Sequence, residues 1–296
     1  MKQILTIATR TSPLAIRQAE IVKELLQQQI PHLKVEFLEI TTAGDIDQTT
    51  PLSAFGNTGV FVKGLESKLL SGEADLAVHS LKDIPADADS QFELLAFPQR
   101  ADARDVLITA DSISLSQLKE GAVVGTSSPA RHEQLRLLRP DLQFRDIRGN
   151  VDTRIQKVKD GHYDATILAA AGLSRLGHSI PGNTYFTLDE LVPSPGQGAL
   201  AIQVRKGNAE VKDILHKINN TTIERQVQAE RRFMQVIGGG CRYPVAAHAE
   251  ILADKVIFRA IAHKPEFTAL KKIKITTSLS ELYATAELCA RQLLHK

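Results

Sequence analysis

The feature that most constrains the fold of this chain is an alternation of short apolar runs with helix-period segments over its first two-thirds. The apolar runs are typical of buried strands and lie at Leu5–Thr9, Val35–Ile40, Asp75–His79, Phe92–Phe97, Asp105–Thr109, Ala122–Gly125, Leu142–Ile147, Tyr163–Ala169 and Ala199–Val204. Strands that alternate with helices predict parallel or mixed α/β sheets, with functional residues at the carboxyl ends of the strands.

The predicted helices begin at capping signals, which in two cases are a serine followed by a proline. These two helices start after Ser12 and Ser128 and run to about Gln29 and Arg139. Three more are expected: a segment carrying Phe61, Leu65, Leu69 and Leu70, then Val151–Lys159, then Ala170–Leu176. A polar loop, Thr41–Thr50, precedes the first of these three.

The last part of the chain follows a different pattern. A helix, Ile223–Val236, ends at three glycines, and Val245–Leu252 with Val256–His263 predicts a hairpin. A third strand, Ile273–Thr277, precedes a final helix, Ser280–Leu294. This part of the chain therefore predicts a small α+β domain.

The length of 296 residues and the changes of pattern predict three domains. The break at 193–198 precedes a strand that we expect to return to the first sheet. Domain 1 is therefore expected at residues 1–98 and 199–217, domain 2 at 99–198, and domain 3 at 218–296.

Composition excludes several classes of protein. Lysine plus arginine total 36 against 34 acids, and the net charge of +2 is too balanced for a general nucleic-acid binder. No tryptophan is present, and no apolar run reaches the ~18 residues of a membrane helix. The first residues show no signal peptide, and the two cysteines form no CxxC pair, so we expect a cytoplasmic protein without nucleic-acid or membrane partners.

Five arginines lie just after predicted strands or on the first turns of the following helices: Arg10, Arg131, Arg148, Arg154 and Arg175. Strand ends converge in an α/β fold, so the five are expected to face one ligand that carries carboxylates or phosphates. The alternative is that these arginines lie on solvated helix surfaces.

Asp83 closes the run His79-Ser80-Leu81-Lys82-Asp83, directly after a predicted buried strand. A carboxylate at this position accepts an N–H from a ligand or stabilises a developing cation. The alternative is that Asp83 caps the local turn before Ile84-Pro85.

The two cysteines differ in their surroundings. Cys289 shares an apolar helical stripe with Leu282, Ala286 and Leu293, which predicts an inert core residue. Cys241 follows three glycines in a loop, which predicts an accessible nucleophile or attachment point. The alternative for Cys241 is an incidental small residue in a turn.

Several stretches, in this order, carry a specific resemblance: 7–15 (IATRTSPLA), 77–85 (AVHSLKDIP), 124–128 (VGTSS), 147–154 (IRGNVDTR), 171–177 (AGLSRLG), 196–199 (GQGA) and 239–241 (GGC). They resemble the porphobilinogen deaminase family, also called hydroxymethylbilane synthases, from about residue 4 to residue 250. Only the last ~45 residues carry no distinctive family motif.

The resemblance implies an enzyme that joins four porphobilinogen molecules head to tail, with release of ammonia, to give 1-hydroxymethylbilane. It implies a dipyrromethane cofactor, bound through a thioether to Cys241. The implied fold class is α/β: two periplasmic-binding-protein-like (type II) α/β domains plus a small C-terminal α+β domain. The implied partner is porphobilinogen, a small-molecule substrate, and the implied state is a monomer.

The resemblance also assigns site residues, with Asp83 as the catalytic group and no metal. The implied cofactor-binding residues are Cys241, Ser80, Lys82, Asp83, Thr126, Ser128, Arg131, Arg148 and Gly172. The implied substrate-binding residues are Arg10, Ser12, Arg148, Arg154, Arg175 and Gln197.

Two positions depart from the family pattern. Thr58 and Ala130 stand where the family usually has a lysine and an arginine, so two cations expected near the cofactor are absent. Two alternatives to a fully active enzyme stay open: a non-catalytic binder of a polycarboxylate, and a relative that has lost full turnover. Ammonia release from porphobilinogen discriminates between an enzyme and a binder.

Overall fold

The structure is a computed structural model that describes residues 2–46, 59, 61–87, 89–238 and 243–295. The chain forms two compact units, the first within residues 1–47, 58–101 and 198–224 and the second within 102–197 and 225–296. The described residues form one sheet in the first unit and two sheets in the second. The division into three domains stays a prediction.

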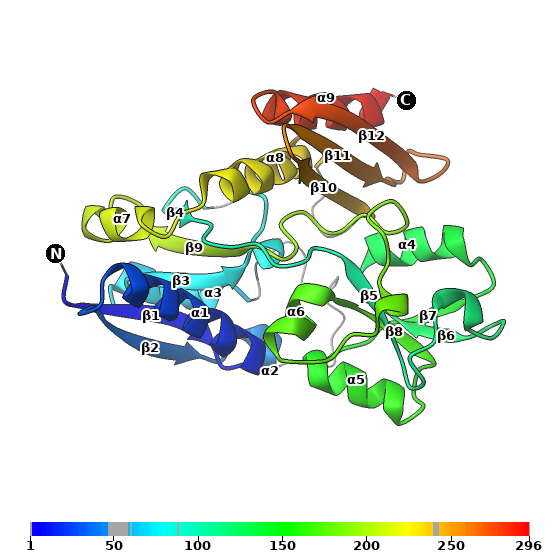
Figure 1. Ribbon diagram of the computed structural model, residues 1–296, viewed down its shortest axis with the longest axis horizontal. Helices are drawn as coiled ribbons and strands as arrows, with labels where there is room; N and C mark the ends of the chain where they lie inside the picture. The colour runs from blue at the N-terminus through cyan, green and yellow to red at the C-terminus, as the bar shows by residue number, and fades with distance from the viewer. Residues whose placement is uncertain (1, 47–58, 60, 88, 239–242, 296) are drawn as a thin grey trace. The chain divides into compact units, whose positions relative to one another are not determined.

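The first unit is built on a five-stranded sheet in the order β2-β1-β3-β9-β4 (Figure 1). The strands are β1 (Ile4–Arg10), β2 (Lys34–Ile40), β3 (Leu76–Ser80), β4 (Phe92–Ala96) and β9 (Leu200–Arg205). Strand β1 pairs in parallel with β2 and β3, whereas β9 is antiparallel to both β3 and β4. The prediction that the chain returns to its first sheet after the break at 193–198 is confirmed.

Helices cover both faces of this sheet. The helices of the unit are α1 (Pro13–Gln29), α2 (Ala43–Ile46), α3 (Lys63–Ser71) and α7 (Ala209–His216), with a 3-10 turn η2 (Leu81–Asp83). Helices α1 and α7 pack on one face through side chains such as Leu26 and Ile214, and α3 packs Leu65 and Leu69 on the other. Burial of these apolar stripes on both faces gives a three-layer unit.

The larger part of the second unit is a four-stranded sheet in the order β5-β8-β6-β7. Its strands are β5 (Asp105–Thr109), β6 (Val123–Gly125), β7 (Gln143–Arg145) and β8 (Ala165–Ala169). Its helices are α4 (Pro129–Leu138), α5 (Val151–Lys159) and α6 (Ala170–Arg175), with 3-10 turns η3 (Leu115–Gln117) and η4 (Gly182–Thr184). Strand β6 is parallel to β7 and β8, so these three strands end at the same sheet edge.

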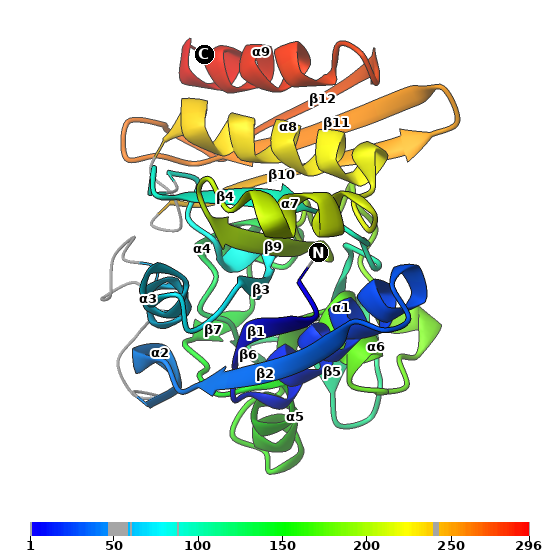
Figure 2. The same cartoon turned by 90° about the vertical axis from the view of Figure 1, so that its left-hand side faces the viewer.

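The remainder of the second unit is an antiparallel sheet, β10-β11-β12, covered by helices (Figure 2). The elements are α8 (Thr221–Ile237), which belongs to this unit from Arg225 on, β10 (Val245–Leu252), β11 (Lys255–Ala262), β12 (Lys271–Ser278) and α9 (Leu282–His295). One face buries Phe233 of α8 and Ala286 of α9 around Phe258. The other face packs Ala246 and Ile261 against Ala130 of α4. The α/β class with an α+β C-terminal part is confirmed.

Three local predictions were wrong or incomplete. The expected polar loop Thr41–Thr50 contains the short helix α2, which its polar composition did not signal. The strand expected at Leu142–Ile147 has only three residues, because β7 pairs only with β6, which itself has three residues. Helix α7 was not predicted, although it packs Val211 and Leu215 into the first core.

Candidate functional site

In the first unit, the predicted site residues gather at the carboxyl ends of β1 and β3. These strands are parallel neighbours, so Arg10 and Ser12 lie at the same edge as Ser80. Ser12 caps α1 by accepting a hydrogen bond from the backbone N–H of Ala15, as predicted. Gln18 of α1 donates from Nε2 to Ser80 Oγ at 2.7 Å and ties this helix to the end of β3.

Asp83 ends the 3-10 turn η2 and is exposed, beside a half-buried Lys82. Across the described part of the chain, the Asp83 carboxylate accepts no hydrogen bond and forms no ion pair. The turn is closed by a backbone hydrogen bond from Ile84 to Leu81 instead. The structure therefore gives no support to Asp83 as a turn cap, and its carboxylate faces solvent.

Arg10 is held by a carboxylate that the sequence analysis did not identify. Its Nε donates to Asp45 Oδ2 at 3.1 Å, and its Nη2 donates to Oδ1. Thr42 donates to the same carboxylate through its backbone N–H and its hydroxyl, at 3.1 and 2.7 Å. The guanidinium also lies 4.1 Å from the centroid of the Phe61 ring. Burial alone would raise the pKa of Asp45, but the Arg10 and Thr42 hydrogen bonds outweigh it and lower the pKa.

In the second unit, the predicted residues follow β6, β7 and β8 at their common edge. Thr126 and Ser128 follow β6, Arg148 follows β7, and Gly172 and Arg175 lie on α6 after β8. Ser128 caps α4 by accepting from the N–H of Arg131 at 3.3 Å. Two helices of nine or more residues, α4 and α5, therefore begin at this edge, and helix N-termini favour anions.

Three guanidinium groups of this edge belong to half-buried or buried residues. Arg148 is 9% exposed, and Arg154 is half-buried and donates from Nε to the carbonyl of Gly149 at 2.8 Å. Burial lowers the pKa of Arg175 to about 10. Taking a cation out of water is costly, and an anionic ligand would offset that cost.

Arg131 and Gln197 belong to a buried polar set with Asp105. Arg131 donates to the Asp105 carboxylate at 3.1 and 2.7 Å, to the carbonyl of Ile167 at 3.1 Å, and to Gln197 Oε1 at 3.3 Å. Gln197 Nε2 donates to Asp105 Oδ1 and to the carbonyl of Ala103, both at 2.7 Å. Asp105 is 1% exposed and Gln197 is fully buried. Protein atoms thus use four of the five N–H groups of Arg131.

Of the two cysteines, the structure describes Cys289, whereas Cys241 lies outside the described residues, as does Thr58. Cys289 is fully buried in the core of the C-terminal sheet, and burial raises its pKa to about 12. The prediction that Cys289 is an inert core residue is confirmed.

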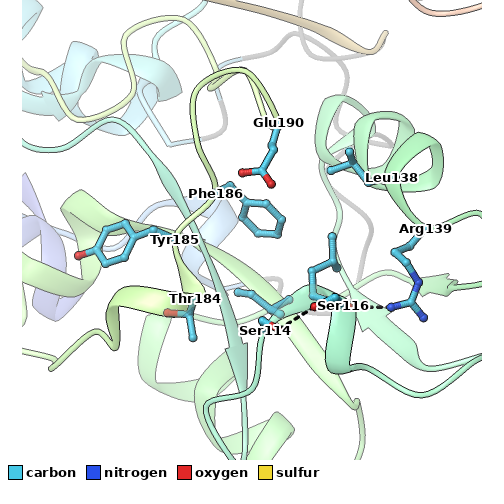
Figure 3. A pocket seen from close by; sticks show the side chains of 10 residues that line it. Ser114, Ser116, Leu138, Arg139, Thr184, Tyr185, Phe186 and Glu190 are labelled. Atoms are coloured by element: carbon cyan, nitrogen blue, oxygen red, sulfur yellow. Dashed lines mark hydrogen bonds between the residues drawn. The ribbon is translucent and has the colours of Figure 1, made fainter.

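A cavity of about 280 Å³ lies elsewhere in the second unit, and no predicted site residue lines it (Figure 3). Most of its polar side chains already have protein partners. Arg139 donates to the Asp141 carboxylate at 2.8 and 2.6 Å and to the carbonyl of Leu115 at 2.6 Å. The Glu190 carboxylate accepts from the backbone and hydroxyl of Thr187 at 2.7 and 2.8 Å. The cavity therefore shows no set of groups directed at a ligand.

Among the described residues, no three His, Cys, Asp or Glu side chains lie close enough together to hold a metal ion. Among the helices of the same residues, none has the length and apolar character needed to cross a membrane.

Comparison with known families decides the assignment. The model of "Porphobilinogen deaminase, dipyromethane cofactor binding domain" matches residues 5–213, and that of "Porphobilinogen deaminase, C-terminal domain" matches residues 225–295. The chain belongs to the porphobilinogen deaminase family. The first match spans both sheet edges described above, and the second spans the C-terminal sheet and its helices.

Curated porphobilinogen deaminases are similar in sequence to this chain over most of its length. A porphobilinogen deaminase of Bordetella parapertussis is 42% identical over 290 residues, covering 98% of this chain and 92% of the relative. The porphobilinogen deaminase of Roseiflexus sp. is 44% identical, and the match covers 88% of this chain and 86% of the relative. That of Thiobacillus denitrificans is 40% identical, and the match covers 98% of this chain and 95% of the relative.

Solved structures give more distant likenesses. The VFT2 domain of BvgS from Bordetella pertussis matches with a TM-score of 0.45 and 18% identity, covering 73% of this chain and 86% of that one. The periplasmic aliphatic sulphonate binding protein SsuA from Escherichia coli matches with a TM-score of 0.41 and 14% identity, covering 74% of this chain and 68% of that one.

Proposed function

We propose that this chain catalyses its family's reaction with Asp83 as the catalytic carboxylate and with the arginines of the two sheet edges as ligands for substrate carboxylates. The reaction joins four porphobilinogen molecules head to tail, releases ammonia, and yields 1-hydroxymethylbilane in tetrapyrrole biosynthesis. The enzyme is a transferase, hydroxymethylbilane synthase.

The observation that carries the catalytic assignment is the state of Asp83. Its carboxylate is exposed at the end of a buried strand and, among the described residues, no protein group holds it. Loss of ammonia from the substrate leaves a positive charge on the pyrrole that had carried the amine. A carboxylate that is already in place stabilises this charge without reorganisation, and its oxygens accept hydrogen bonds from pyrrole N–H groups.

The dipyrromethane cofactor of the family carries acetate and propionate groups, and the donors in the second unit fit such a molecule. Carboxylates suit the N-termini of α4 and α5, the hydroxyls of Thr126 and Ser128, and the buried guanidinium of Arg148. When bound, the cofactor supplies the pyrrole to which the first substrate is joined. We assign its covalent attachment, through a thioether, to Cys241.

The proposed ligands divide into two groups. The cofactor ligands are Lys82, Ser80, Gly172, Thr126, Ser128 and Arg148. The ligands for substrate carboxylates are Arg10, Ser12, Arg148, Arg154 and Arg175.

Arg131 and Gln197 contribute less directly than the family pattern implies. Because four N–H groups of Arg131 already donate to protein oxygens, this side chain offers a single N–H to a ligand.

The cysteine usage supports a cytoplasmic location, and the balanced charge supports a protein without a nucleic-acid partner. The absence of a long apolar run supports a protein without a membrane partner. The monomeric state is what the resemblance to the family implies. Gel filtration with light scattering tests the monomer directly, and an elution mass of two chains would contradict it.

The test of the function uses purified protein and porphobilinogen. We expect ammonia and bilane to appear in a ratio of about four to one, at a rate proportional to protein concentration. Binding of porphobilinogen without release of ammonia would favour the non-catalytic binder instead. Ammonia release that stops after one or two additions would favour a relative that has lost full turnover.

A further inference from the structure

A second buried carboxylate in the second unit lies outside the family pattern described above. Glu230, on α8, is fully buried. Its Oε2 accepts a hydrogen bond from the backbone N–H of Gly196 at 2.7 Å, and its Oε1 accepts from the backbone N–H of Ala249 at 2.8 Å. His248 Nδ1 lies 3.4 Å from the same Oε1. One side chain thus joins α8, strand β10 and the loop that contains Gly196.

That loop also presents Gln197 to the polar set around Arg131. Gly196 and Gln197 are adjacent, and both are buried. Gln197 contacts Arg131 through Oε1 and Asp105 through Nε2. Hydrogen bonds therefore run from β10 through Glu230, the loop and Gln197 to the guanidinium of Arg131. Elements far apart in sequence are fixed to one another by these contacts.

The two elements that Glu230 ties together flank the proposed attachment cysteine. Helix α8 ends at Ile237 and β10 begins at Val245, so the segment with Cys241 leaves one and enters the other. We propose that Glu230 is a positioning residue that fixes the Gly196-Gln197 loop to α8 and β10, and thereby sets Arg131 for loading of the cofactor at Cys241. This inference rests on the proposed function.

The chemistry of the side chain explains why a carboxylate is needed here. A buried carboxylate is costly unless its oxygens receive hydrogen bonds, and apolar packing would be cheaper for stability alone. The two backbone N–H groups approach different oxygens, and a carboxylate can accept both. A glutamine has one acceptor oxygen, so its NH2 group would face one of the two N–H donors. Glu230→Gln therefore keeps the shape of the side chain and breaks one of the two ties.

The test follows loading in apo-protein made in cells that lack porphobilinogen. Porphobilinogen is added, and intact mass spectrometry follows the fraction of the protein that has gained mass. This fraction is expressed relative to the amount of folded protein. We expect Glu230→Gln to load at least about fivefold more slowly than the parent. One buried backbone N–H then lacks an acceptor, and the tie that it made is lost. Glu287→Gln, which removes a carboxylate that pairs with Arg232 between α8 and α9, is the matched control and should load as the parent does.

A second comparison separates positioning from general loss of stability. If Glu230 acts through Gln197, then Gln197→Ala should slow loading to a similar degree, and the double variant should be no slower than the slower single variant. Effects that multiply in the double variant would overturn the inference. Loading of Glu230→Gln at the parental rate would overturn it as well. A parent that gains no mass would overturn the attachment at Cys241, and this inference with it.

Discussion

Three aspartates near strand ends show how differently one residue type is used in this chain. Asp45 and Asp105 each accept two hydrogen bonds from an arginine, and both are largely buried. Asp83 is exposed, and within the described ranges no protein group holds it. A carboxylate that already neutralises an arginine has little to offer a cation on the substrate, so the proposed catalytic role belongs to Asp83.

Asp83→Asn should lower the rate of bilane formation by about a hundredfold or more, because a neutral amide does not stabilise the cation left by ammonia. Fold and cofactor content should stay as in the parent, since the side chain is exposed. The rate is measured on folded, cofactor-loaded protein. Asp87→Asn, at another exposed acid four residues on, is the control and should keep the parental rate. A rate within a few-fold of the parent for Asp83→Asn would remove Asp83 from the chemistry.

Position 130 shows why the arginine that the family usually has there does not suit this chain. Ala130 is 6% exposed and packs with Val192, Ala246 and Ile261. Ala130→Arg would bring a guanidinium into this apolar cluster, and we expect it to lower the free energy of unfolding by at least about 2 kcal/mol. Urea denaturation measures the change.

Leu137→Arg is the matched control for this prediction, because Leu137 lies on the same helix and is 52% exposed. It should change the free energy of unfolding by less than about 0.5 kcal/mol. If Ala130→Arg were as stable as the parent and gained cofactor affinity, the apolar packing of position 130 would be the wrong explanation for its alanine.

At the scale of elements, strand β3 buries a titratable group that the proposed reaction does not use. His79 is 6% exposed, its Nε2 lies 3.0 Å from Gln203 Oε1, and Gln203 Nε2 donates to Glu66 at 2.8 Å. Burial lowers the pKa of His79 to about 4. Since histidine in the unfolded chain titrates near pH 6.5, the unfolded state binds a proton between these values that the folded state does not.

The fold should therefore lose stability as the pH falls from about 6.5 to about 4, with a slope from His79 that approaches about 1.4 kcal/mol per pH unit. His79→Asn should lack this part of the slope, whereas His162→Asn, at an exposed histidine, should retain it. Urea denaturation at several pH values between 5 and 7 makes the comparison. Equal slopes for the parent and His79→Asn would show that burial does not lower the pKa of His79.

Elements with a strong local pattern could be predicted from the sequence. Helix α1 begins after Ser12 and ends at Gln29 as expected, because its cap and its apolar stripe are both local signals. Helix α7 has no such cap, and its helical form depends on packing Val211 and Ile214 into a core built from distant strands. Tertiary packing of this kind leaves little trace in local sequence.

The candidate site could be predicted only in part for the same reason. Strand ends identified where Arg10 and Arg131 would lie. They did not show that Asp45 and Asp105 already hold these arginines, because the partners are 35 and 26 positions away in sequence. Glu230 gave no local signal either, since on its helix it is one acid among several charged residues. Which cations are directed at a ligand is a property of the folded chain.

At the scale of the whole molecule, each unit brings its own part of the chemistry. The first unit carries Asp83 and Arg10, and the second carries the hydroxyls, helix N-termini and arginines that suit the cofactor. Tethering one end of the growing chain to the protein turns each addition into a reaction between held partners, which removes much of its entropic cost. The central claim of this account is that Cys241 provides this tether.

The intact mass of protein isolated from cells that make porphobilinogen tests this claim most directly. We predict a mass greater than that of the sequence by one dipyrromethane unit, and peptide mapping should place it on the peptide that contains Cys241. Cys241→Ser should lack both the adduct and the activity, whereas Cys289→Ser should keep both, with some loss of stability because Cys289 is fully buried. A fully active parent without the added mass would contradict the account.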